Sequence, residues 1–433
     1  MDEKQLTQDK GCAVFWFRRD LRLQDNIALQ KALDENYCVL PVFIFDDNIL
    51  EELPREDARV QFIYEELSAI NTSLREYGSG LKVYQGKPDA VWRQILKTCR
   101  VSAVYVNRDY EPYALERDAM VEQLLASNGI PLLTCKDQVV FEPDEILKED
   151  QNPYHVFTPY KNKWLRQFRG ISVSPLRSHG SFFQGEFAFP ELEEIGFART
   201  SVQVLPYDLS CLEHYAEDRD YPWKKASTRL GPHLRFGTIS IRQVIESLDP
   251  AHEVFLSELI WREFFKQILF HYPRVVQENF KTGYNGVQWL NRESDFEKWC
   301  LGKTGYPMVD AGMRELHATG YMHNRVRMIT AGFLCKHLLI DWRWGESYFA
   351  EKLLDFELSS NNGNWQWAAG TGCDAAPYFR IFNPVEQQKK FDPMLVYVKE
   401  WVPEFGTAAY PAPIVDHKMA RARALEVYRS GIS

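Results

Sequence analysis

Residues 359–374, with the sequence SSNNGNWQWAAGTGCD, combine side-chain amides and large aromatic rings within a few helical turns. Asn361 and Trp365 lie four residues apart and so share one helix face, whereas Trp367 points to a different face. An amide can bond the edge of a polar ring, and an indole can stack on the face of that ring. The spacing therefore predicts a pocket for a planar ligand with a polar edge.

Two other segments place polar and aromatic side chains at helical spacing. In SELIWREFF an acid, an indole, a guanidinium and a phenyl ring follow at positions i, i+3, i+4 and i+7, namely Glu258, Trp261, Arg262 and Phe265. In MHNRVRMITAGFL, Asn324, Arg327 and Met328 share one face. Taken singly, each set is also typical of an ordinary amphipathic helix with an ion pair.

Acids and hydroxyl groups near two predicted helix starts complete this set of candidate residues. Asp355 and Glu357 come just before a predicted N-cap at Ser359 or Ser360. In KASTRLGPHLRFGTIS, hydroxyls and main-chain amides at the start of a helix can hold a phosphate, a signal that is weak by itself. Together the segments predict a deep pocket with a phosphate cradle, acid–base pairs, amides and aromatic walls.

The elements that position these residues fall in two parts of the chain. Five short apolar runs alternate with helical patterns over residues 1–140, namely CAVFWF (12–17), CVLPVFIF (38–45), LKVYQG (81–86), AVYVNRDY (103–110) and PLLTC (131–135). This alternation predicts an α/β N-terminal domain with a doubly wound, Rossmann-like parallel sheet. Neither a GxGxxG fingerprint nor a Walker A loop is present, so the predicted fold alone says little about function.

The rest of the chain changes character twice. Residues 141–205 are rich in proline, glycine and acids, which predicts a connector with one helix near YKNKWLRQF. From residue 206 to residue 433 helical periodicity dominates and predicts an all-α domain. The candidate residues described above all lie in that all-α domain.

The composition is that of a globular protein without a membrane span. Of the 433 residues, 45% are hydrophobic and 26% are charged, and no run of about 18 apolar residues occurs. The charged N-terminus does not resemble a secretory signal, and the eight scattered cysteines form no CxxC pair; this predicts reduced cysteines, no zinc site and a cytoplasmic location. Of the net charge of −9, only −1 belongs to residues 201–433, so the helical domain could present a basic surface.

Five stretches resemble the DNA photolyase/cryptochrome family: VFWFRRDLRLQDNIAL, LSELIWREFF, GKTGYPMVDAGMREL, MHNRVRMITAGFL and NNGNWQWAAGTGCDAAPYFRIFNP. The similarity extends from about residue 12 to residue 405 and is strongest toward class I cyclobutane pyrimidine dimer photolyases. The resemblance implies one folded FAD per chain, held in the helical domain and active in its reduced form. It also implies that blue light drives an electron from FAD to a flipped-out dimer, whose cyclobutane ring then splits.

Position by position, the resemblance assigns a cofactor site. The phosphates would be lined by Tyr215 and by the STRLG run, that is Ser227, Thr228, Arg229, Leu230 and Gly231. The remaining cofactor contacts would be Phe255, Glu258, Arg262, Arg327, Asp355, Phe356 and Glu357, with an ion pair between Arg327 and Asp355. Asn361 would face flavin N5, where plant-type cryptochromes have an aspartate, and this difference favours repair over signalling.

The resemblance also assigns substrate and DNA contacts. Glu258 and Asn324 would bond the polar edges of the dimer and, with Asn361, serve catalysis; Asn324 stands where (6-4) photolyases have a second histidine. Further dimer contacts would come from Trp261, Arg262, Phe265, Met328 and Trp367. The DNA-facing rim would include Arg219, Arg325, Arg380, Gln387, Lys389 and Lys390, although solvated surface charge explains the two lysines equally well.

Three tryptophans, Trp365, Trp342 and Trp289, match the family's chain for electron transfer between flavin and surface. Folate-binding members have an Asn-Glu pair where this chain has Tyr113 and Ala114, which leaves an antenna chromophore open between folate, a deazaflavin, another flavin and none. The sequence thus predicts a monomer that repairs cyclobutane pyrimidine dimers in DNA and binds no membrane. The alternative is a cryptochrome-type blue-light receptor without repair activity, which the absence of a long C-terminal extension after residue 433 disfavours.

Overall fold

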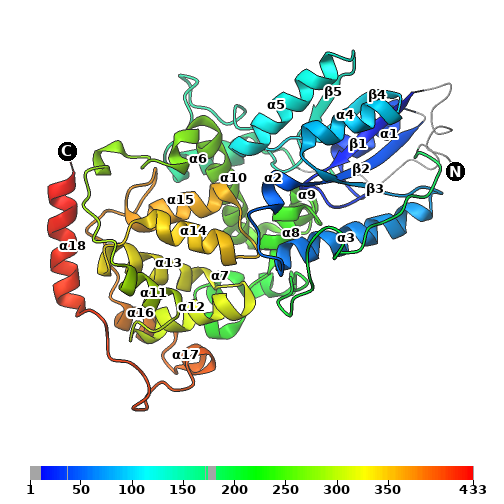
Figure 1. Ribbon diagram of the computed structural model, residues 1–433. Helices are drawn as coiled ribbons and strands as arrows, with labels where there is room; N and C mark the ends of the chain where they lie inside the picture. The colour runs from blue at the N-terminus through cyan, green and yellow to red at the C-terminus, as the bar shows by residue number, and fades with distance from the viewer. Residues whose placement is uncertain (1–10, 37, 171, 174–181, 433) are drawn as a thin grey trace. The chain divides into compact units, whose positions relative to one another are not determined.

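The computed structural model of the chain describes residues 11–36, 38–170, 172–173 and 182–432, and its contacts group into two compact units (Figure 1). The sheet unit comprises Met1–Glu142, Arg169–Leu205 and Gly231–Leu248, and the helical unit comprises Pro143–Phe168, Pro206–Leu230 and Asp249–Ser433. The predicted fold class, an α/β N-terminal part and a helical C-terminal part, is confirmed. The segment expected to be a connector, residues 141–205, is divided between the two units.

The sheet unit contains five parallel strands in the order β3-β2-β1-β4-β5. Their bounds are β1 Cys12–Phe17, β2 Val39–Asp46, β3 Lys82–Gly86, β4 Val101–Asn107 and β5 Leu132–Cys135. Each strand overlaps one of the five apolar runs. Because β1 and β2 are buried along their whole length, their apolar residues follow one another without polar alternation, as in parallel sheets covered on both faces.

Helices cover both faces of this sheet. Those of the unit are α1 Ile27–Glu35, α2 Asp47–Leu50, α3 Ala58–Arg75, α4 Pro88–Thr98, α5 Pro112–Ala126, α9 Ile241–Glu246 and, except for its first residue, α8 Leu230–Phe236. On one face Phe15 and Phe17 pack with α1 and α3, and on the other Val14 and Trp16 pack with α4 and α5. Successive strand residues point to opposite faces, so one strand supplies both cores.

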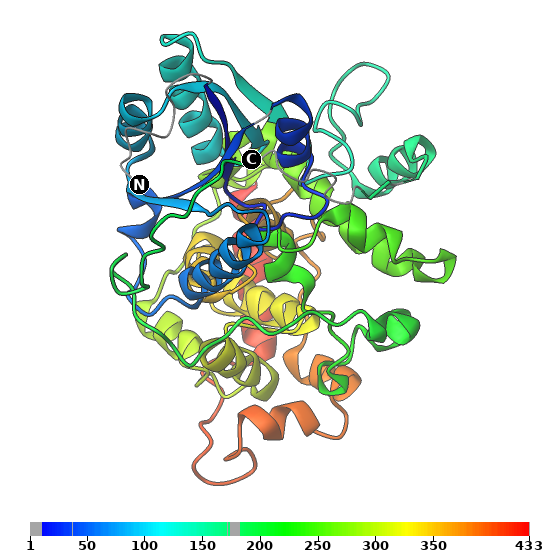
Figure 2. The same ribbon diagram turned by 90° about the vertical axis from the view of Figure 1, so that its right-hand side faces the viewer.

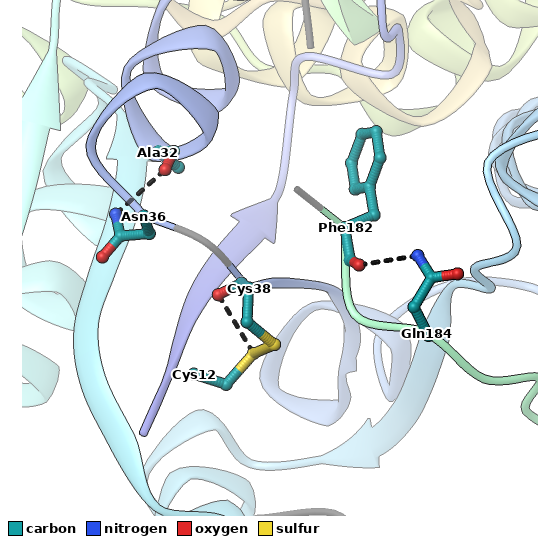
Figure 3. The surroundings of a disulfide bond; sticks show 6 residues. All are labelled: Cys12, Ala32, Asn36, Cys38, Phe182 and Gln184. Atoms are coloured by element: carbon teal, nitrogen blue, oxygen red, sulfur yellow. Dashed lines mark hydrogen bonds between the residues drawn. A yellow bond between two sulfur atoms is a disulfide. The ribbon is translucent and has the colours of Figure 1, made fainter. Parts of the chain in front are cut away.

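Cys12 and Cys38 form a disulfide where β1 and β2 begin (Figure 3). The strand register explains the pairing, because Ala13 lies opposite Val39 and the residues before them are therefore neighbours as well. The expectation of reduced cysteines is wrong for this pair. The other cysteines are free: Cys99, Cys135, Cys211, Cys300, Cys335 and Cys373.

The helical unit is built from α-helices joined by short turns. The helices are α6 Phe157–Gln167, α7 Tyr215–Asp218, α10 Glu253–His271, α11 Glu293–Cys300, α12 Pro307–Thr319, α13 Asn324–Gly332, α14 Trp342–Lys352, α15 Leu358–Ala369, α16 Pro384–Phe391, α17 Val396–Trp401 and α18 His417–Gly431. Single 3-10 turns are η2 Ser210–His214, η3 Pro222–Lys224, η4 Pro250–His252, η5 Pro273–Val276 and η6 Thr282–Tyr284. Helices α13 and α14 both pack against α15 (Figure 1).

Two helix ends differ from the periodicity of the sequence. The pattern MHNRVRMITAGFLCKHLLI predicts one helix, but α13 ends at Gly332 and the chain continues as a π-helical turn, η7 Phe333–His337. Helix α14 ends at Lys352, so Asp355 and Glu357 lie in the turn that leads into α15. That turn brings both carboxylates to the start of α15.

A large apolar core holds the helical unit together. It includes the fully buried rings of Trp299, Trp342 and Phe333 together with Trp365.

Residues 183–209 contain no helix or strand, in keeping with their proline and glycine content (Figure 2). None of the helices in the described residues is long and apolar enough to cross a membrane.

Candidate ligand pocket in the helical unit

The helical unit contains a pocket beside α13, α14 and α15 that encloses about 600 Å³ of space, part of it open to solvent. Nine residues singled out in the sequence line it, namely Asn324, Arg327, Met328, Asp355, Phe356, Glu357, Asn361, Trp365 and Trp367. The rest of the lining comes from Ala331, Phe349, Leu353, Ser360, Asn364 and Ala368. Two stretches of the sequence, residues 324–331 and 349–368, therefore meet at one cavity. Trp367 lines it together with Trp365, although helical spacing predicts that Trp367 points elsewhere.

The ends of α13 and α15 explain how the lining residues are presented. Helix α13 begins after His323, whose ring nitrogen Nδ1 accepts from the Arg325 main-chain N–H over 3.2 Å. Burial lowers the pKa of His323 to about 4, so this ring stays neutral and can act as an acceptor. Helix α15 has Glu357 as its N-cap and ends at Ala369, with Gly370 as its C-cap, whose φ of 90° favours glycine.

The predicted N-cap of α15 is therefore wrong. Ser359 and Ser360 lie inside the first turn, because the helix already begins at Leu358. Ser359 is 3% exposed, and its hydroxyl oxygen has no hydrogen-bond partner among the described residues.

Two glycines let neighbouring helices approach α15 closely. A Cβ atom at Gly345 of α14 would lie 2.1 Å from the Trp365 ring, and one at Gly363 would lie 2.1 Å from the Phe265 ring of α10. Any larger residue at either position would push an aromatic ring out of place. The walls of the pocket thus depend on small residues that carry no ligand-binding group themselves.

An ion pair links α13 to the turn before α15. Arg327 Nη2 donates to Asp355 Oδ2 over 2.9 Å, as the resemblance implies, and Arg327 Nε donates to the Met322 carbonyl oxygen over 2.8 Å. The second carboxylate oxygen, Asp355 Oδ1, is buried and has no hydrogen-bond partner among the described residues. A buried acceptor left in this way is costly unless a donor from a ligand or water reaches it.

A second carboxylate receives two cations from α10. Glu357 Oε1 lies 3.1 Å from Arg262 Nη2 and 2.8 Å from Lys266 Nζ, and Lys266 is 2% exposed. Ser360 Oγ donates to Glu357 Oε2 over 3.4 Å. Sequence reasoning missed Lys266, although a single lysine within the apolar run FFKQILF was a visible signal for a buried partner.

The amide of Asn361 is bound by another residue that sequence reasoning missed. Its Nδ2 donates to the carbonyl oxygen of Glu346 and to Glu346 Oε1, both over 3.1 Å. Burial raises the pKa of Glu346 to about 7, against the smaller opposite effect of the Asn361 hydrogen bond. No spacing rule within α14 points to this acid, because its partner lies on the neighbouring helix.

Glu258 lies in a separate cluster that does not line the pocket. Arg219 Nη1 donates to Glu258 Oε1 over 2.6 Å, and the guanidinium lies 5.5 Å from the centre of the Tyr215 ring. The Tyr215 ring meets Phe255 edge-on at 5.1 Å. Burial raises the pKa of Tyr215 to about 12. The structure thus brings four of the predicted site residues together, but they contact one another and do not line the pocket.

Two aromatic residues of α10 are used for packing in this arrangement. Trp261 stacks on Phe157 with a centroid distance of 3.7 Å and an interplanar angle of 8°. Phe265 is 5% exposed and packs against α15 at Gly363. Neither ring lines the pocket in which the sequence places them as dimer contacts. Trp261 and Phe265 of α10 thus face neighbouring helices. The spacing within one helix does not show which neighbour a side chain will contact.

The STRLG run lies at the start of α8, which begins at Leu230. Thr228 is 8% exposed, its Oγ1 accepts from the Leu230 N–H over 3.4 Å, and Arg229 has a left-handed φ of 54°. Ser227 to Leu230 belong to the helical unit and Gly231 to the sheet unit. None of the five residues lines the pocket.

The three tryptophans of the predicted electron-transfer chain differ in exposure. Trp365 and Trp342 are 2% and 0% exposed, whereas Trp289 is half-buried. Trp342 Nε1 donates to Asn279 Oδ1 over 2.9 Å, and Trp289 meets a tyrosine ring edge-on at 5.8 Å. The rings in contact with Trp365 are those of Phe349, at 4.9 Å, and of Trp299, at 6.1 Å. Two of the three tryptophans are thus buried and the third is half-buried, and their role as an electron-transfer chain stays a prediction.

The basic side chains predicted to face DNA are of two kinds. Arg325 Nη2 lies 2.6 Å from Asp220 Oδ1 and Lys389 Nζ lies 2.8 Å from Glu386 Oε1, so both are ion-paired. Arg380 is exposed, and its carbonyl oxygen accepts from the buried Lys336 Nζ over 3.1 Å. Lys390 is exposed and Gln387 is half-buried on the same helix as Lys389.

Tyr113 and Ala114, the positions linked with a second chromophore, lie in the first turn of α5. The Tyr113 hydroxyl donates to Asp46 at the end of β2, and burial raises the pKa of Tyr113 to about 12. The carboxyl ends of parallel strands are a common ligand-binding edge. Within the described residues, no group of three or more metal-binding side chains comes together.

Comparison with protein families covers both units. Residues 13–178 match the family model described as DNA photolyase, and residues 255–409 match that described as the FAD binding domain of DNA photolyase. All residues that line the pocket fall within the second match. The deoxyribodipyrimidine photo-lyases of Synechococcus and of Halobacterium salinarum are 34% and 36% identical to the chain. Each alignment covers 96% of this chain, and 96% and 98% of those proteins respectively.

Solved structures of similar fold include two photolyases and a cryptochrome. A bacterial class III photolyase from Agrobacterium tumefaciens gives a TM-score of 0.87 at 33% identity and covers 98% of both chains. An archaeal photolyase from Sulfolobus tokodaii with two FAD molecules gives 0.86 at 36% identity, covering 96% of this chain and 99% of that one. A Synechocystis cryptochrome gives 0.83 at 26% identity, covering 97% and 100%. Similarity to a class III enzyme leaves the class I assignment a prediction.

Proposed function

The chain belongs to the DNA photolyase family, and we propose that it repairs cyclobutane pyrimidine dimers in DNA with light and bound FAD. One observation supports this most directly. The pocket lies wholly within the match to the FAD-binding domain and combines one buried acceptor that has no partner among the described residues, Asp355 Oδ1, with aromatic walls. Relatives named deoxyribodipyrimidine photo-lyase that align over nearly the whole chain support the substrate class.

The side chains in the pocket fit the polar edge and apolar faces of a flavin. Asp355 Oδ1 is a buried acceptor to which no described residue donates, and a flavin and its ribityl chain carry N–H and O–H donors. Phe349, Phe356 and Trp365 offer apolar walls for a planar ring. When bound and reduced, FAD supplies the electron that light drives into the dimer.

In the proposed site, this chain's own residues orient both ligands. Arg327 holds Asp355 in place, and Arg262 with Lys266 does the same for Glu357, so that both acids present fixed acceptors to the cofactor. We assign the phosphates to Tyr215 and the STRLG run by resemblance. No side chain acts as a nucleophile in this proposal; the protein contributes position and electrostatics.

The dimer would enter beside the cofactor. Asn324, Met328 and Trp367 line the same pocket as the proposed flavin contacts and give an amide and two apolar surfaces. A dimer has lost normal base pairing, so flipping it out of DNA costs less than flipping an intact base. Glu258 would join this site by exchanging its bond with Arg219 for one with the dimer, and Trp261 by leaving its stack on Phe157.

The decisive experiment uses an oligonucleotide that contains one cyclobutane thymine dimer. The FAD-loaded, chemically reduced protein should restore intact thymines under blue light and leave the dimer untouched in the dark. Restoration in the dark, or no restoration in the light with FAD bound, would refute the proposal. An otherwise identical oligonucleotide with a (6-4) lesion is the matched control and should remain unrepaired.

A cryptochrome-type receptor without repair activity is the second candidate. The similarity to a Synechocystis cryptochrome favours it, whereas Asn361 and Asn324 favour repair in the resemblance. The same oligonucleotide separates the two, because such a receptor would bind FAD and respond to light without splitting the dimer. If the chain is a repair enzyme, substituting Trp365→Phe should block light-driven reduction of oxidised flavin and leave dimer repair by the pre-reduced protein intact.

A further inference from the structure

Lys336 is a buried cation that lies outside the pocket of the helical unit. It belongs to the η7 turn, is 2% exposed, and its Nζ donates to the Arg380 carbonyl oxygen over 3.1 Å. No carboxylate in the described part of the chain pairs with it, and a main-chain oxygen takes that place. Burying an ammonium without an acid costs free energy, so the fold alone gains little from a lysine at this position.

The oxygen that Lys336 binds belongs to a tight turn at the surface. The Arg380 N–H donates to the Pro377 carbonyl oxygen over 2.8 Å, which closes a β-turn over residues 377–380. Phe379 is 59% exposed and Arg380 is exposed as well. The turn thus presents a phenyl ring and a guanidinium to solvent, while the carbonyl oxygen of its last residue is bound from the interior.

Apolar contacts hold the chain on either side of Arg380. Tyr378 stacks on Tyr428 of α18 with a centroid distance of 5.9 Å and an interplanar angle of 4°. Ile381 packs against the small buried cluster to which Tyr428 belongs. Between these two anchors, the hydrogen bond from Lys336 fixes the main chain at Arg380 itself.

The stretch that carries Lys336 departs from regular helix geometry. The Leu338 N–H donates to the Phe333 carbonyl oxygen, five residues back, over 3.1 Å. Such π-helical turns are frequent at functional sites. Burial lowers the pKa of Lys336 to about 8, so most of the ammonium stays charged at pH 7 and is a strong donor.

We propose that Lys336 is a positioning residue for DNA binding: its ammonium fixes the main chain of the turn at residues 377–380, so that the Arg380 guanidinium is held in place for a DNA phosphate. The proposal rests on the proposed function, because it takes dimer DNA as the ligand of Arg380. A turn that is already ordered loses less conformational freedom on binding, and this preorganisation raises affinity. Lys336 itself does not touch the DNA.

A double-mutant cycle tests whether Lys336 acts through Arg380. Lys336→Met keeps the length of the side chain and removes the donor and the charge. We expect Lys336→Met and Arg380→Ala each to weaken binding of dimer DNA about fivefold, and the double variant to bind no more weakly than Arg380→Ala. Fluorescence anisotropy with a dimer-containing oligonucleotide at one salt concentration gives the four dissociation constants. Lys298→Met removes an exposed lysine of α11 as the control and should bind as the wild type does.

Hydrogen exchange follows the turn in the absence of DNA. The Arg380 amide is protected by its bond to Pro377, and without the bond from Lys336 its exchange should become about tenfold faster. Mass spectrometry of a peptide that spans the turn measures this in Lys336→Met, with Lys298→Met again unchanged. Should Lys336→Met fail to bind FAD, Lys336→Gln, which keeps a shorter neutral donor, replaces it in both experiments and should give smaller effects of the same direction.

Two results would overturn the role of Lys336. Additive losses of affinity in the double variant would mean that the lysine acts independently of Arg380, and unchanged exchange at Arg380 would mean that it does not fix the turn. Dimer repair by pre-reduced wild type is measured in parallel. Normal repair with additive losses would contradict the Lys336 proposal and leave the proposed function standing. A non-additive cycle in a protein that binds dimer DNA but fails to repair it in light would do the reverse.

Discussion

Asp137 in the sheet unit and Asp355 in the helical unit are both carboxylates held by arginine, yet their surroundings differ. The Asp137 carboxylate receives Arg22 and Arg242, each over 2.6 Å, and the residue is 2% exposed. Asp355 receives a single guanidinium, that of Arg327, on one oxygen, while the other oxygen is buried and finds no partner in the part of the chain that the structure describes. A saturated carboxylate stabilises the fold, and an unsaturated one is available to a ligand.

The pKa of Asp137 supports the first half of this comparison. Burial pushes the pKa of this carboxyl upward, but Arg22 and Arg242 outweigh burial and hold it below its ordinary value. A carboxyl whose folded pKa is lowered stabilises the protein above its unfolded pKa of about 4. That stabilisation is lost as the pH falls through the folded pKa.

The largest effect is therefore expected for Asp137→Ala. Removing this carboxylate leaves the buried Arg22 guanidinium without an acid partner among the described residues, whereas Arg242 keeps Asp25 at 2.8 Å. The loss of a partner from a buried charge should lower the free energy of unfolding by about 3–5 kcal/mol. Urea unfolding followed by circular dichroism measures it, with the exposed Asp34→Ala as the control. A decrease in unfolding free energy of less than about 1 kcal/mol would show that Asp137 stabilises the fold no more than Asp355 does.

Asp355→Asn should act on the ligand and much less on the fold. The Arg327 side chain beside it is 27% exposed and can reach water, so we expect a loss of about 1 kcal/mol in unfolding free energy without FAD. FAD affinity should fall about tenfold, because an acceptor at Oδ1 is lost or replaced. Flavin fluorescence on release gives the dissociation constant, and Asp144→Asn, an exposed acid of the helical unit, is the control. Unchanged affinity would place the cofactor elsewhere.

Glu346 sharpens the comparison, because it is a half-buried carboxyl with no cation bound to it among the described residues. Its folded pKa of about 7 lies above the unfolded value near 4.5, so the folded chain binds the extra proton. Stability of the FAD-free protein should fall as pH rises from about 4.5 to 7 and level off above. After discounting for partial exposure, we expect a change of about 1–2 kcal/mol. Thermal unfolding at stepped pH should show this slope in the wild type and not in Glu346→Gln.

The smallest effect concerns the rim, where partnered and unpartnered cations can again be compared. Arg380 is exposed and no described acid pairs with it, whereas Lys389 is paired with Glu386. Arg380→Ala should reduce the slope of log affinity against log salt for dimer DNA by about 0.9, as expected for one lost phosphate contact. Lys389→Ala should change the slope little. Fluorescence anisotropy between 50 and 200 mM salt measures both slopes, and equal slopes in the two variants would contradict the distinction.

Much of the site could be predicted because its chemistry is local. The i and i+4 relation of Asn361 and Trp365, the two acids before α15 and the polar face of Asn324 and Arg327 follow from local sequence patterns, and all six residues line the pocket. The strands were equally accessible, since buried parallel strands have continuous apolar runs that short-range patterns reveal. The family resemblance supplied the cofactor and the reaction, which spacing alone could not.

Residues that depend on a neighbouring element escaped prediction. The Cys12–Cys38 bond follows from strand register, Lys266 binds an acid 91 positions further along the chain, and Glu346 binds an amide on another helix. Trp261 and Phe265 lie on the expected helix, but their rings pack on neighbours away from the pocket. In each case the partner of the residue lies on another strand or helix, and only the folded structure shows which one it is.

The sequence by itself therefore determined the fold class, the helices that bear the candidate residues and the chemistry they offer, because these depend on neighbours within a few positions. Only the tertiary structure decided which polar groups are satisfied by the protein and which are left for a ligand. Hydrogen bonds saturate: once Arg22 and Arg242 hold Asp137 nothing more is required, whereas one oxygen of Asp355 is still without a donor.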